Sequence, residues 1–336
     1  MNHVAIDLGS KESQVCMRSP DGTIVLERKH RTSELPVLLR TWSQSRVIVE
    51  TASEAFRIAD AARAAGHEVR VVPSVLSKQL GVGERGIKTD LRDARKLSEV
   101  SCRIDLPTVH IPTSATRELR AMLRSRATLI AARTQLVNHV RGWTRTQLGR
   151  LRSGWTPTLP DRVRAYATQQ ELALPAHIEQ VLLALETLTA QIKLADTEVQ
   201  SRAKASPICR RLMTVPGIGP ITAMTFLASI ETPSRFTHAH RVGSYLGLAP
   251  GENSSSERQQ RTGITKAGPS LVRAMLVQAA WIALRRYPTD PMICWAMQII
   301  ERRGKHIAVV ALARKLSGVM FALWRDNTTY TPRRTM

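Results

Sequence analysis

Residues 45–73 read SRVIVETASEAFRIADAARAAGHEVRVVP, and this stretch decides the fold of the N-terminal third. SRVIVETA (45–52) is typical of a buried strand, and VRVVP (69–73) of a second one. Between them, EAFRIADAARAAGHEV (54–69) has helical spacing, with Gly66 as its stop. Because a strand, a helix and a second strand in one sheet pair in parallel, the stretch predicts a parallel strand pair.

The flanking segments extend this α/β pattern over residues 1–110. VAIDLG (4–9) is a short apolar run, DGT (21–23) is a turn signal and TIVLE (23–27) is β-branched, so together they predict a hairpin. KTDLRDARKLSEVS (88–101) is rich in Ala, Leu and Arg and predicts a helix.

Residues 111–204 predict a helical, elongated arm. Apolar residues recur every seven positions in 117–150, and again in 178–199 at Ile178, Leu185, Ile192 and Val199. Two prolines in 152–161 predict the turn between these helices. The pattern fits both two packed helices of one protomer and an intermolecular coiled coil.

Residues 205–330 predict a mainly helical domain. LMTVPGIGPITAMTFLASI (212–230) resembles a helix-hairpin-helix, in which backbone N–H groups face a phosphate, and it also fits a simple tight turn. A polar loop at 250–269 precedes apolar helices at 270–284 and 306–324.

Charge separates the three segments. The whole chain of 336 residues carries a net charge of +22. Residues 1–110 hold 17 basic and 14 acidic side chains, residues 111–204 hold 14 and 7, and residues 205–336 hold 18 and 6. Such an excess indicates a polyanionic partner, nucleic acid before a membrane surface, and disfavours small-molecule metabolism.

Other sequence features indicate a cytoplasmic compartment. The four cysteines form no CxxC pair, which disfavours a zinc knuckle or a disulfide framework. The start MNHVAIDLGSKESQ is charged too early for a signal peptide, and no uninterrupted apolar run reaches the length of a membrane span.

Four acids are candidate metal ligands. Asp7 and Glu50 end predicted strands, and Asp90 and Asp93 lie three apart on one helix face. Crowded carboxylates need a cation, and hard oxygen ligands suit Mg²⁺ or Mn²⁺. Alone, Asp7 also fits a polar cap and Asp90 a helix cap. AIDLGS also fits the phosphate loop of actin-like and sugar-kinase ATPases, but the sequence shows no second Asp-x-Gly loop.

A serine loop and a basic arm are the other candidates. A serine that attacks DNA phosphorus needs positive groups around it, although the loop composition also fits a flexible surface loop. Arginines of the arm are candidate phosphate contacts, and Trp143 and Trp155 beside them fit base stacking or core packing. The candidates are Ser254, Ser255 and Ser256 with Arg258, Arg261 and Lys266 in the loop, and Arg124, Arg126 and Arg133 in the arm.

Six motifs follow one another along the chain: AIDLGSKE (5–12), VIVETA (47–52), KTDLRDARKLSE (88–99), PGIGPITA (216–223), YLGLAPGENSSSERQQRTGITKAGPSLVRAML (245–276) and RGKHIAVVALARKLSGVMFALW (303–324). In this order they resemble the motifs of the DEDD insertion-sequence transposases called the IS-one-ten family, in the IS-eleven-eleven branch, which includes pilin-gene DNA invertases.

The resemblance implies a RuvC-like (RNase H-like) domain at 1–110, a coiled-coil arm at 111–204 and a C-terminal transposase domain at 205–330. It implies that the four acids bind the metal and that Ser255 joins covalently to DNA. Relatives usually have glycine after that serine, whereas this chain has Ser256, so the register among the three serines is open.

The resemblance also implies partners: target and donor DNA, a non-coding bridge RNA, and further copies of the chain in a tetramer of two dimers. In that tetramer the acids of one protomer complete a site with the serine of another. It further implies a prokaryotic protein associated with the nucleoid. Two other functions remain as alternatives. One is a RuvC-like structure-selective endonuclease, or an invertase without RNA guidance, and the other is an inactive relative that only binds nucleic acid.

Overall fold

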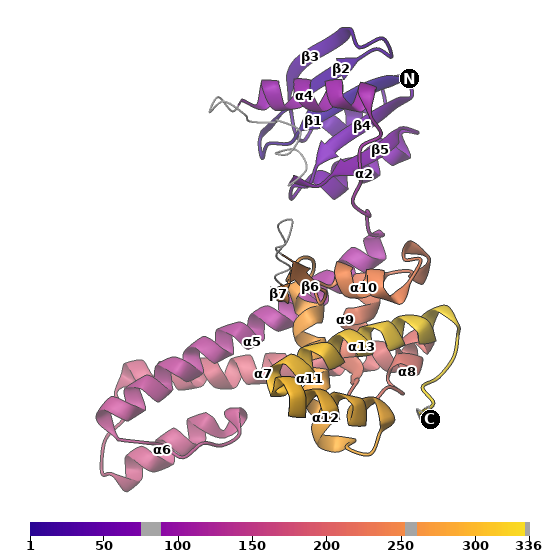
Figure 1. Cartoon of the computed structure of the whole chain (residues 1–336). Helices are drawn as coiled ribbons and strands as arrows, with labels where there is room; N and C mark the ends of the chain where they lie inside the picture. Colours follow the sequence, from indigo (N-terminus) through magenta and orange to yellow (C-terminus); the bar gives the residue numbers. More distant parts are fainter. Residues whose placement is uncertain (75–88, 253–260, 333–336) are drawn as a thin grey trace. The chain divides into compact units, whose positions relative to one another are not determined.

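The computed structural model describes residues 1–74, 89–252 and 261–332 (Figure 1). The chain divides into two compact units, unit 1 (Met1–Pro112) and unit 2 (Thr113–Met336). The division lies two residues from the end of the predicted 1–110 segment, while the predicted segments 111–204 and 205–330 both belong to unit 2.

Unit 1 is built on a five-stranded mixed sheet with the order β3-β2-β1-β4-β5. β1 pairs antiparallel with β2 and parallel with β4, while β4 pairs parallel with β5, which confirms the parallel pair expected from residues 45–73. The strands are β1 (Asn2–Asp7), β2 (Glu12–Arg18), β3 (Ile24–Arg31), β4 (Ser45–Glu50) and β5 (Glu68–Val72).

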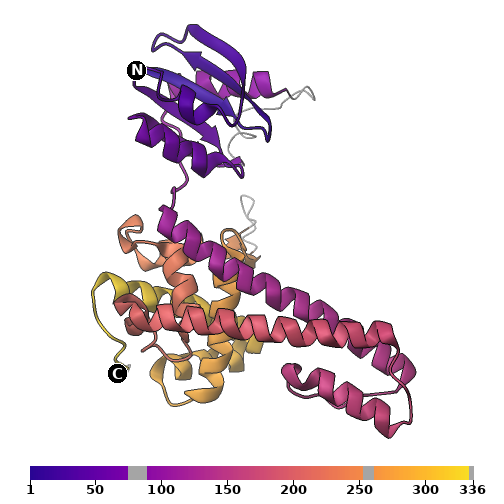
Figure 2. The same cartoon turned by 180° about the vertical axis from the view of Figure 1, so that it is seen from behind.

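Helices cover both faces of this sheet. α1 (Leu35–Leu38) and α2 (Ala55–Ala64) pack on the face that carries Val4, Ile6 and Val49. α4 (Asp90–Arg103) packs on the opposite face, as Figures 1 and 2 show, where Leu97 contacts the cluster of Ala5 and Ile48. Successive residues of a strand point to opposite faces, so each strand supplies both cores.

The hairpin around the DGT turn forms between other strands than expected. The DGT turn joins β2 to β3, and β2, read as ESQVCMR, stands between the two strands that were expected to form the hairpin. β2 lacks a strand signal because Ser13 and Gln14 are polar, yet both are buried. Ser13 compensates by a 2.8 Å hydrogen bond to the Thr32 hydroxyl.

Two long helices form the arm of unit 2, α5 (Ser114–Gln147) and α7 (Ala176–Ala205). Leu123 shares a cluster with Val199 and Ala203, whereas Val137 and Val140 share one with Leu182 and Leu185. Contacts therefore move backward along α7 as they move forward along α5. The two helices are antiparallel and pack within one chain, and Figure 2 shows them side by side.

The heptad residues of α7 are its core positions. Ile178, Leu185, Ile192 and Val199 are all buried, as their spacing predicts. The connection, however, is longer than a turn, because a 3-10 turn (Thr156–Thr158) leads into a further helix, α6 (Leu159–Gln169). Its proline stands in the first helical turn, where a missing N–H breaks no hydrogen bond.

The rest of unit 2 is a helical bundle with one small hairpin. Its largest core contains Phe226 of α9 and Phe321 of α13, both fully buried. α11 and α13 confirm the apolar helices expected at 270–284 and 306–324. The elements are α8 (Pro207–Leu212), α9 (Pro220–Ile230), a 3-10 turn (Pro233–Arg235), α10 (Ala239–Tyr245), β6 (Pro250–Glu252), β7 (Arg261–Ile264), α11 (Ser270–Arg286), α12 (Pro291–Arg303) and α13 (Lys305–Arg325).

One helix of the described chain, α13, is long and apolar enough to cross a membrane by length and composition. Half of its apolar window is buried inside the protein, and Leu312, Leu316 and Phe321 belong to the core of unit 2. Packing against the bundle accounts for its apolar character.

Candidate functional site

Asp7 and Glu50 end two neighbouring strands. β1 and β4 pair in parallel with Ile6 opposite Val49, and each acid is the next residue of its strand. Adjacent strands lie about 4.8 Å apart. Ala5 and Ile48 face α4, so the two-residue period of a strand places Asp7 and Glu50 on that same face.

The direction of α4 brings its first turn toward these acids. The His3 Nδ1 atom lies 2.8 Å from the Ser101 hydroxyl, and Leu97 packs with Ala5. The contacts advance from residue 3 to residue 5 along β1 and go back from residue 101 to residue 97 along α4, so α4 runs antiparallel to β1. The two steps match in length, because two strand residues span about 6.6 Å and four helix residues about 6 Å. Continued by one step, this register puts Asp93 at the end of α4 that lies on the Asp7 side of β1.

Asp93 is buried and Asp90 is exposed. The Asp93 side chain is 7% exposed and belongs to the buried face of α4 with Ala94, Leu97 and Ser98. Thr89 caps the helix, accepting a hydrogen bond of 3.3 Å from the Arg92 N–H, so Asp90 is not the cap. The structure thus brings three of the four predicted acids to one edge of one face, with Asp90 one turn of α4 beyond Asp93.

A groove of about 710 Å³ is lined by Asp90 and by the β1–β2 connection, and Asp90 is the one of the four acids that lines it. Lys11, Lys29 and Arg31 also line it. Cations beside carboxylates suit a polyanion that approaches the acids. The spacing of these three cations in the sequence gives no signal, because strand pairing alone brings them together.

The donor set of this edge is composed of oxygens only, which is the chemistry that Mg²⁺ or Mn²⁺ requires. Among the residues described, no group of three or more His, Cys, Asp or Glu side chains is close enough to hold a metal ion as it stands. The four acids therefore fit such a cation by type and by placement on one face rather than as a closed cluster.

The segments on either side of the candidate serines in the sequence form a β-hairpin, here called the serine hairpin. β6 and β7 pair antiparallel, with Pro250 opposite Ile264 and Glu252 opposite Arg261. Ser254, Ser255, Ser256 and Arg258 lie outside the described residues. Composition alone indicates a loop over this whole region, and the strand pairing is what the sequence did not reveal.

The base of this hairpin is fixed by backbone contacts. The Thr265 N–H donates to the Ala249 carbonyl at 2.9 Å, and the Lys266 N–H donates to the Gly247 carbonyl at 3.1 Å. Gly268 has φ of +81°, and a Cβ there would lie 2.0 Å from the Tyr245 carbonyl oxygen. Lys266 itself is exposed beside this base.

An apolar cavity of about 1100 Å³ adjoins the hairpin and was not signalled by any motif. Thr262 and Ile264 line it from the hairpin, and Trp295 from α12. The α13 face adds Arg314 and Lys315, and the Lys315 ammonium lies 4.1 Å from the Trp295 ring centroid. An apolar floor with a cationic rim thus stands beside the serine hairpin.

The Pro-Gly-Ile-Gly turn is packed into the bundle. Val215 and Ile218 are buried in the main core of unit 2. A Cβ at Gly217 would lie 2.4 Å from the Ala279 carbonyl oxygen of α11. Close packing on α11 therefore accounts for Gly217 without a phosphate.

The arm arginines differ in their surroundings. Arg126 is 15% exposed and forms an ion pair with Asp196 of α7. Arg124 is exposed and Arg133 is half-buried. Trp143 packs against the arm core, while Trp155 is 74% exposed. The charge of Arg126 is thus neutralised by an ion pair within the arm, whereas Trp155 lies outside the arm core.

Comparison with known proteins identifies the class of protein. A model described as a DEDD transposase of the IS110 type matches residues 4–145, and a model described as Transposase IS116/IS110/IS902 family matches residues 209–292. The first covers the four acids and most of α5, and the second covers the serine hairpin. Both assign the chain to the insertion-sequence transposases.

Curated relatives agree. The chain is similar to a probable family 20 transposase of Pseudomonas aeruginosa, at 27% identity with 99% of each chain covered. It is 29% identical to the transposase for insertion sequence element IS1111A of Coxiella burnetii, over 72% of this chain and 68% of the relative. It is 30% identical to a putative transposase of Sinorhizobium fredii, over 79% and 71%. The chain belongs to the IS110/IS116/IS902 transposase family.

Proposed function

We propose that this transposase is an RNA-guided, Mg²⁺-dependent DNA recombinase that cuts and rejoins DNA through a serine–DNA intermediate. The observation that supports the proposal is the register of β1, β4 and α4, from which we infer that Asp7, Glu50 and Asp93 share one edge of the sheet face covered by α4. A mixed sheet with helices on both faces supports a RuvC-like assignment for unit 1.

The acids would act together. Asp7 and Glu50 are held by strand pairing, and Asp93 by the buried face of α4, so their positions depend on the rigid part of unit 1. A divalent cation held by these carboxylates and Asp90 would polarise the scissile phosphate and offset its charge. Lys11, Lys29 and Arg31 would hold the flanking phosphates in the groove.

The serine would perform the covalent step. The Ser255 hydroxyl oxygen forms a bond to phosphorus and releases its proton, the bond from phosphorus to the 3′ oxygen breaks, and that oxygen leaves as a 3′-hydroxyl after protonation. Rejoining reverses these bonds with a new 3′-hydroxyl, which regenerates the serine. Arg258, Arg261 and Lys266 would stabilise the negative charge of the pentavalent transition state.

A bridge RNA that pairs with target and donor DNA, and a tetramer made of two dimers, complete the proposal. The strong positive charge of the chain supports a nucleic-acid guide, since residues 111–336 hold 32 basic and 13 acidic side chains, a net charge of +19 out of +22. The resemblance of its motifs supports the oligomer.

The test uses the full chain with donor DNA, target DNA and RNA transcribed from the element. We expect Ser255→Ala to abolish recombination and the DNA-linked protein band on a denaturing gel, while RNA binding is retained. Ser254→Ala and Ser256→Ala are the matched controls, because they remove the same hydroxyl from neighbouring positions.

Three outcomes contradict parts of the proposal. Recombination by Ser255→Ala removes that residue as nucleophile, and loss only in Ser254→Ala or Ser256→Ala moves the register. DNA cleavage without attached protein in the unmodified chain favours the structure-selective endonuclease, in which the acids activate water. Full recombination without RNA favours an invertase without guidance.

A further inference from the structure

We propose that the tip of the α5–α7 arm is a binding site for a nucleic-acid segment with unpaired bases, in which Arg141, Arg145 and Arg150 hold the phosphates and Trp155 stacks on a base. The inference goes beyond the recombination chemistry, because it involves neither the acids nor the serine. It assigns a ligand to a part of the chain that the two constellations above do not use.

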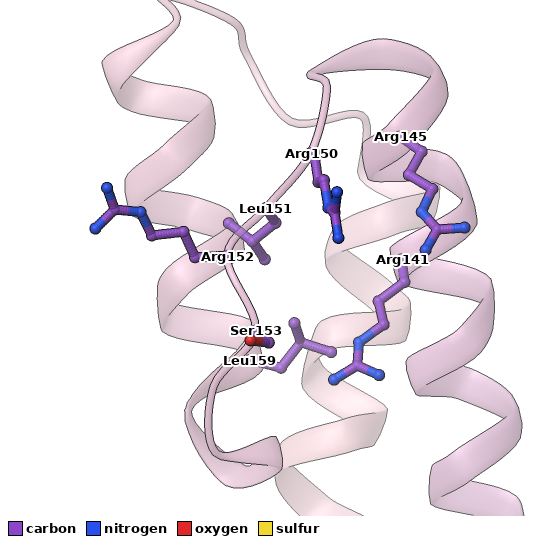
Figure 3. Close-up of a pocket in the computed structure, with 7 residues that line it drawn as sticks. All are labelled: Arg141, Arg145, Arg150, Leu151, Arg152, Ser153 and Leu159. Carbon is purple, nitrogen blue, oxygen red and sulfur yellow. The ribbon is translucent and has the colours of Figure 1, made fainter.

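The site is a hollow of about 500 Å³ where α5 ends. Arg141 and Arg145 lie one turn apart on α5, Arg150 and Arg152 follow on the connecting segment, and Leu159 forms part of the wall. Figure 3 shows the side chains of Arg141, Arg145 and Arg150 gathered between that segment and α5, while Arg152 extends to the other side.

These cations have no acidic counterpart in the structure as described. No acid is among the residues that line the hollow, and the described residues supply no ion pair to any of the four arginines. The acids of α6 and α7 nearest in sequence pair with Arg164, which lies 3.8 Å from Asp161 and 2.5 Å from both Glu179 and Glu186. Several exposed guanidinium groups in one hollow repel one another, so an anionic ligand would relieve an existing electrostatic cost.

The residue type indicates phosphate. All four cations are arginines, whose planar fork donates two parallel hydrogen bonds to one phosphate group. Three guanidinium groups around a shared hollow suit successive phosphates of a backbone better than one small anion. A polynucleotide is therefore the ligand of this chemistry.

Trp155 extends the argument from phosphates to bases. It is 74% exposed, the largest exposed fraction among the large apolar side chains described, and it lies on the same connecting segment as Arg150 and Arg152. Arg162 fixes that segment by donating to the Arg152 carbonyl at 2.8 Å and to the Trp155 carbonyl at 3.2 Å. An exposed indole on the segment that also carries Arg150 and Arg152 offers a stacking platform, which requires a base that is not paired.

RNA and DNA share this chemistry, so the test uses three probes: an RNA hairpin with an unpaired loop, the DNA hairpin of the same sequence, and a blunt DNA duplex. Binding of the full-length chain is measured by fluorescence anisotropy over a salt series without divalent cations, in a Ser255→Ala background. Anisotropy measures binding and requires no cleavage, so a failure of the proposed recombination mechanism leaves this result unaffected.

We expect Arg141→Gln/Arg145→Gln/Arg150→Gln to weaken hairpin binding and to lower the slope of log affinity against log salt by about 2, since each single-strand phosphate contact contributes about 0.7. The control Arg57→Gln/Arg103→Gln/Arg202→Gln removes the same charge from exposed arginines paired with Glu54, Glu99 and Glu198. It should leave the slope within about 0.5 of the parent, less than one contact.

Trp155→Ala should weaken hairpin binding by about 5- to 100-fold, the range for one stacked base, with the slope unchanged. Trp155→Phe should recover most of the loss, and Tyr287→Ala, which removes an aromatic ring that is 44% exposed on another helix, should have no effect. Binding of the duplex should change least.

The two hairpins show which nucleic acid the site binds. A loss of affinity confined to the RNA hairpin assigns the site to RNA, and an equal loss of affinity for both hairpins shows that the site accepts RNA and DNA alike. An unchanged slope for all three probes in the arginine variant overturns the proposal. The proposal is also overturned if the arginine variant loses as much affinity for the duplex as for the hairpins while Trp155→Ala changes no affinity. The site would then bind only backbone charge. Far-ultraviolet circular dichroism confirms that the variants keep their helices.

Discussion

The His3 ring nitrogen Nδ1 lies 2.8 Å from the Ser101 hydroxyl oxygen and joins the start of β1 to the last turn of α4. This single contact sets the register between helix and strand. With Leu97 over Ala5, it determines that the first turn of α4, and not its last, lies beside Asp7. The candidate acidic edge depends on this antiparallel placement.

The same histidine gives unit 1 a pH dependence. Burial lowers the pKa of His3 below its usual 6.5, and the nearby Arg46 guanidinium lowers it further. Because the folded pKa lies below the unfolded one, His3 contributes stability that is present above pH 6.5 and is lost as the pH falls through the folded value. We expect an NMR titration of the full chain to show one histidine titrating below pH 6.5, absent in His3→Gln. An unshifted His3 resonance would contradict this placement.

Substitution of an acid of the candidate site should affect recombination differently from substitution of another acid of unit 1. We expect Asp93→Asn and Glu50→Gln to reduce recombination by about 100-fold or more, as loss of an electrostatic stabiliser does, with binding of DNA retained. Asp105→Asn is the control, since Asp105 is 73% exposed and forms an ion pair with Arg70 at 3.1 Å on the surface of unit 1. Chelation of divalent cations should have the same effect as the two site variants. Activity retained in Asp93→Asn would remove that residue from the site.

Arg126 and Arg124 should differ although they lie two residues apart. Arg126 pairs with Asp196 and is 15% exposed, so Arg126→Gln should lower the free energy of unfolding by about 1–3 kcal/mol. It should leave the salt dependence of nucleic-acid binding unchanged. Arg124→Gln and Arg133→Gln should instead leave stability within about 0.5 kcal/mol and reduce the salt slope. Denaturant unfolding and anisotropy measure the two quantities, and a slope change in Arg126→Gln would contradict the assignment.

The base of the serine hairpin should tolerate no side chain at Gly268. A Cβ there would lie 2.0 Å from the Tyr245 carbonyl oxygen, and the φ of +81° already disfavours alanine by about 1–2 kcal/mol. We expect Gly268→Ala to lower the thermal midpoint and to abolish recombination. Gly22→Ala is the matched control, because Gly22 has φ of +91° but nothing within 4 Å of an added Cβ. If both variants behave alike, close packing at the hairpin base is not the cause.

The sequence is sufficient where local pattern and burial agree. β4, α2 and β5 follow from apolar periodicity, and the seven-residue spacing of α7 identifies its buried face at Ile178, Leu185 and Ile192. The order of the acids along the chain, one at each of two strand ends and two on a helix, also follows from the sequence.

The sequence is insufficient where tertiary contacts override the local preference for a structure. β2 holds polar Ser13 and Gln14 because its neighbours bury and bond them, and α6 begins with a proline that reads as a turn. β6 and β7 have the composition of a loop, and only their pairing, as Pro250 opposite Ile264 records, makes them strands. Long-range pairing is invisible to a local pattern.

By itself, then, the sequence determined the class of chemistry: carboxylates for a divalent cation, a serine among cations, and a charge of +22 that requires a polyanion. Residue types carry chemistry wherever they lie. The tertiary structure decided which charges are available, since Arg126 forms an ion pair with Asp196, whereas Arg141, Arg145 and Arg150 line one hollow. A charge binds a ligand only when folding leaves it without an internal partner, and that is a property of three-dimensional neighbours.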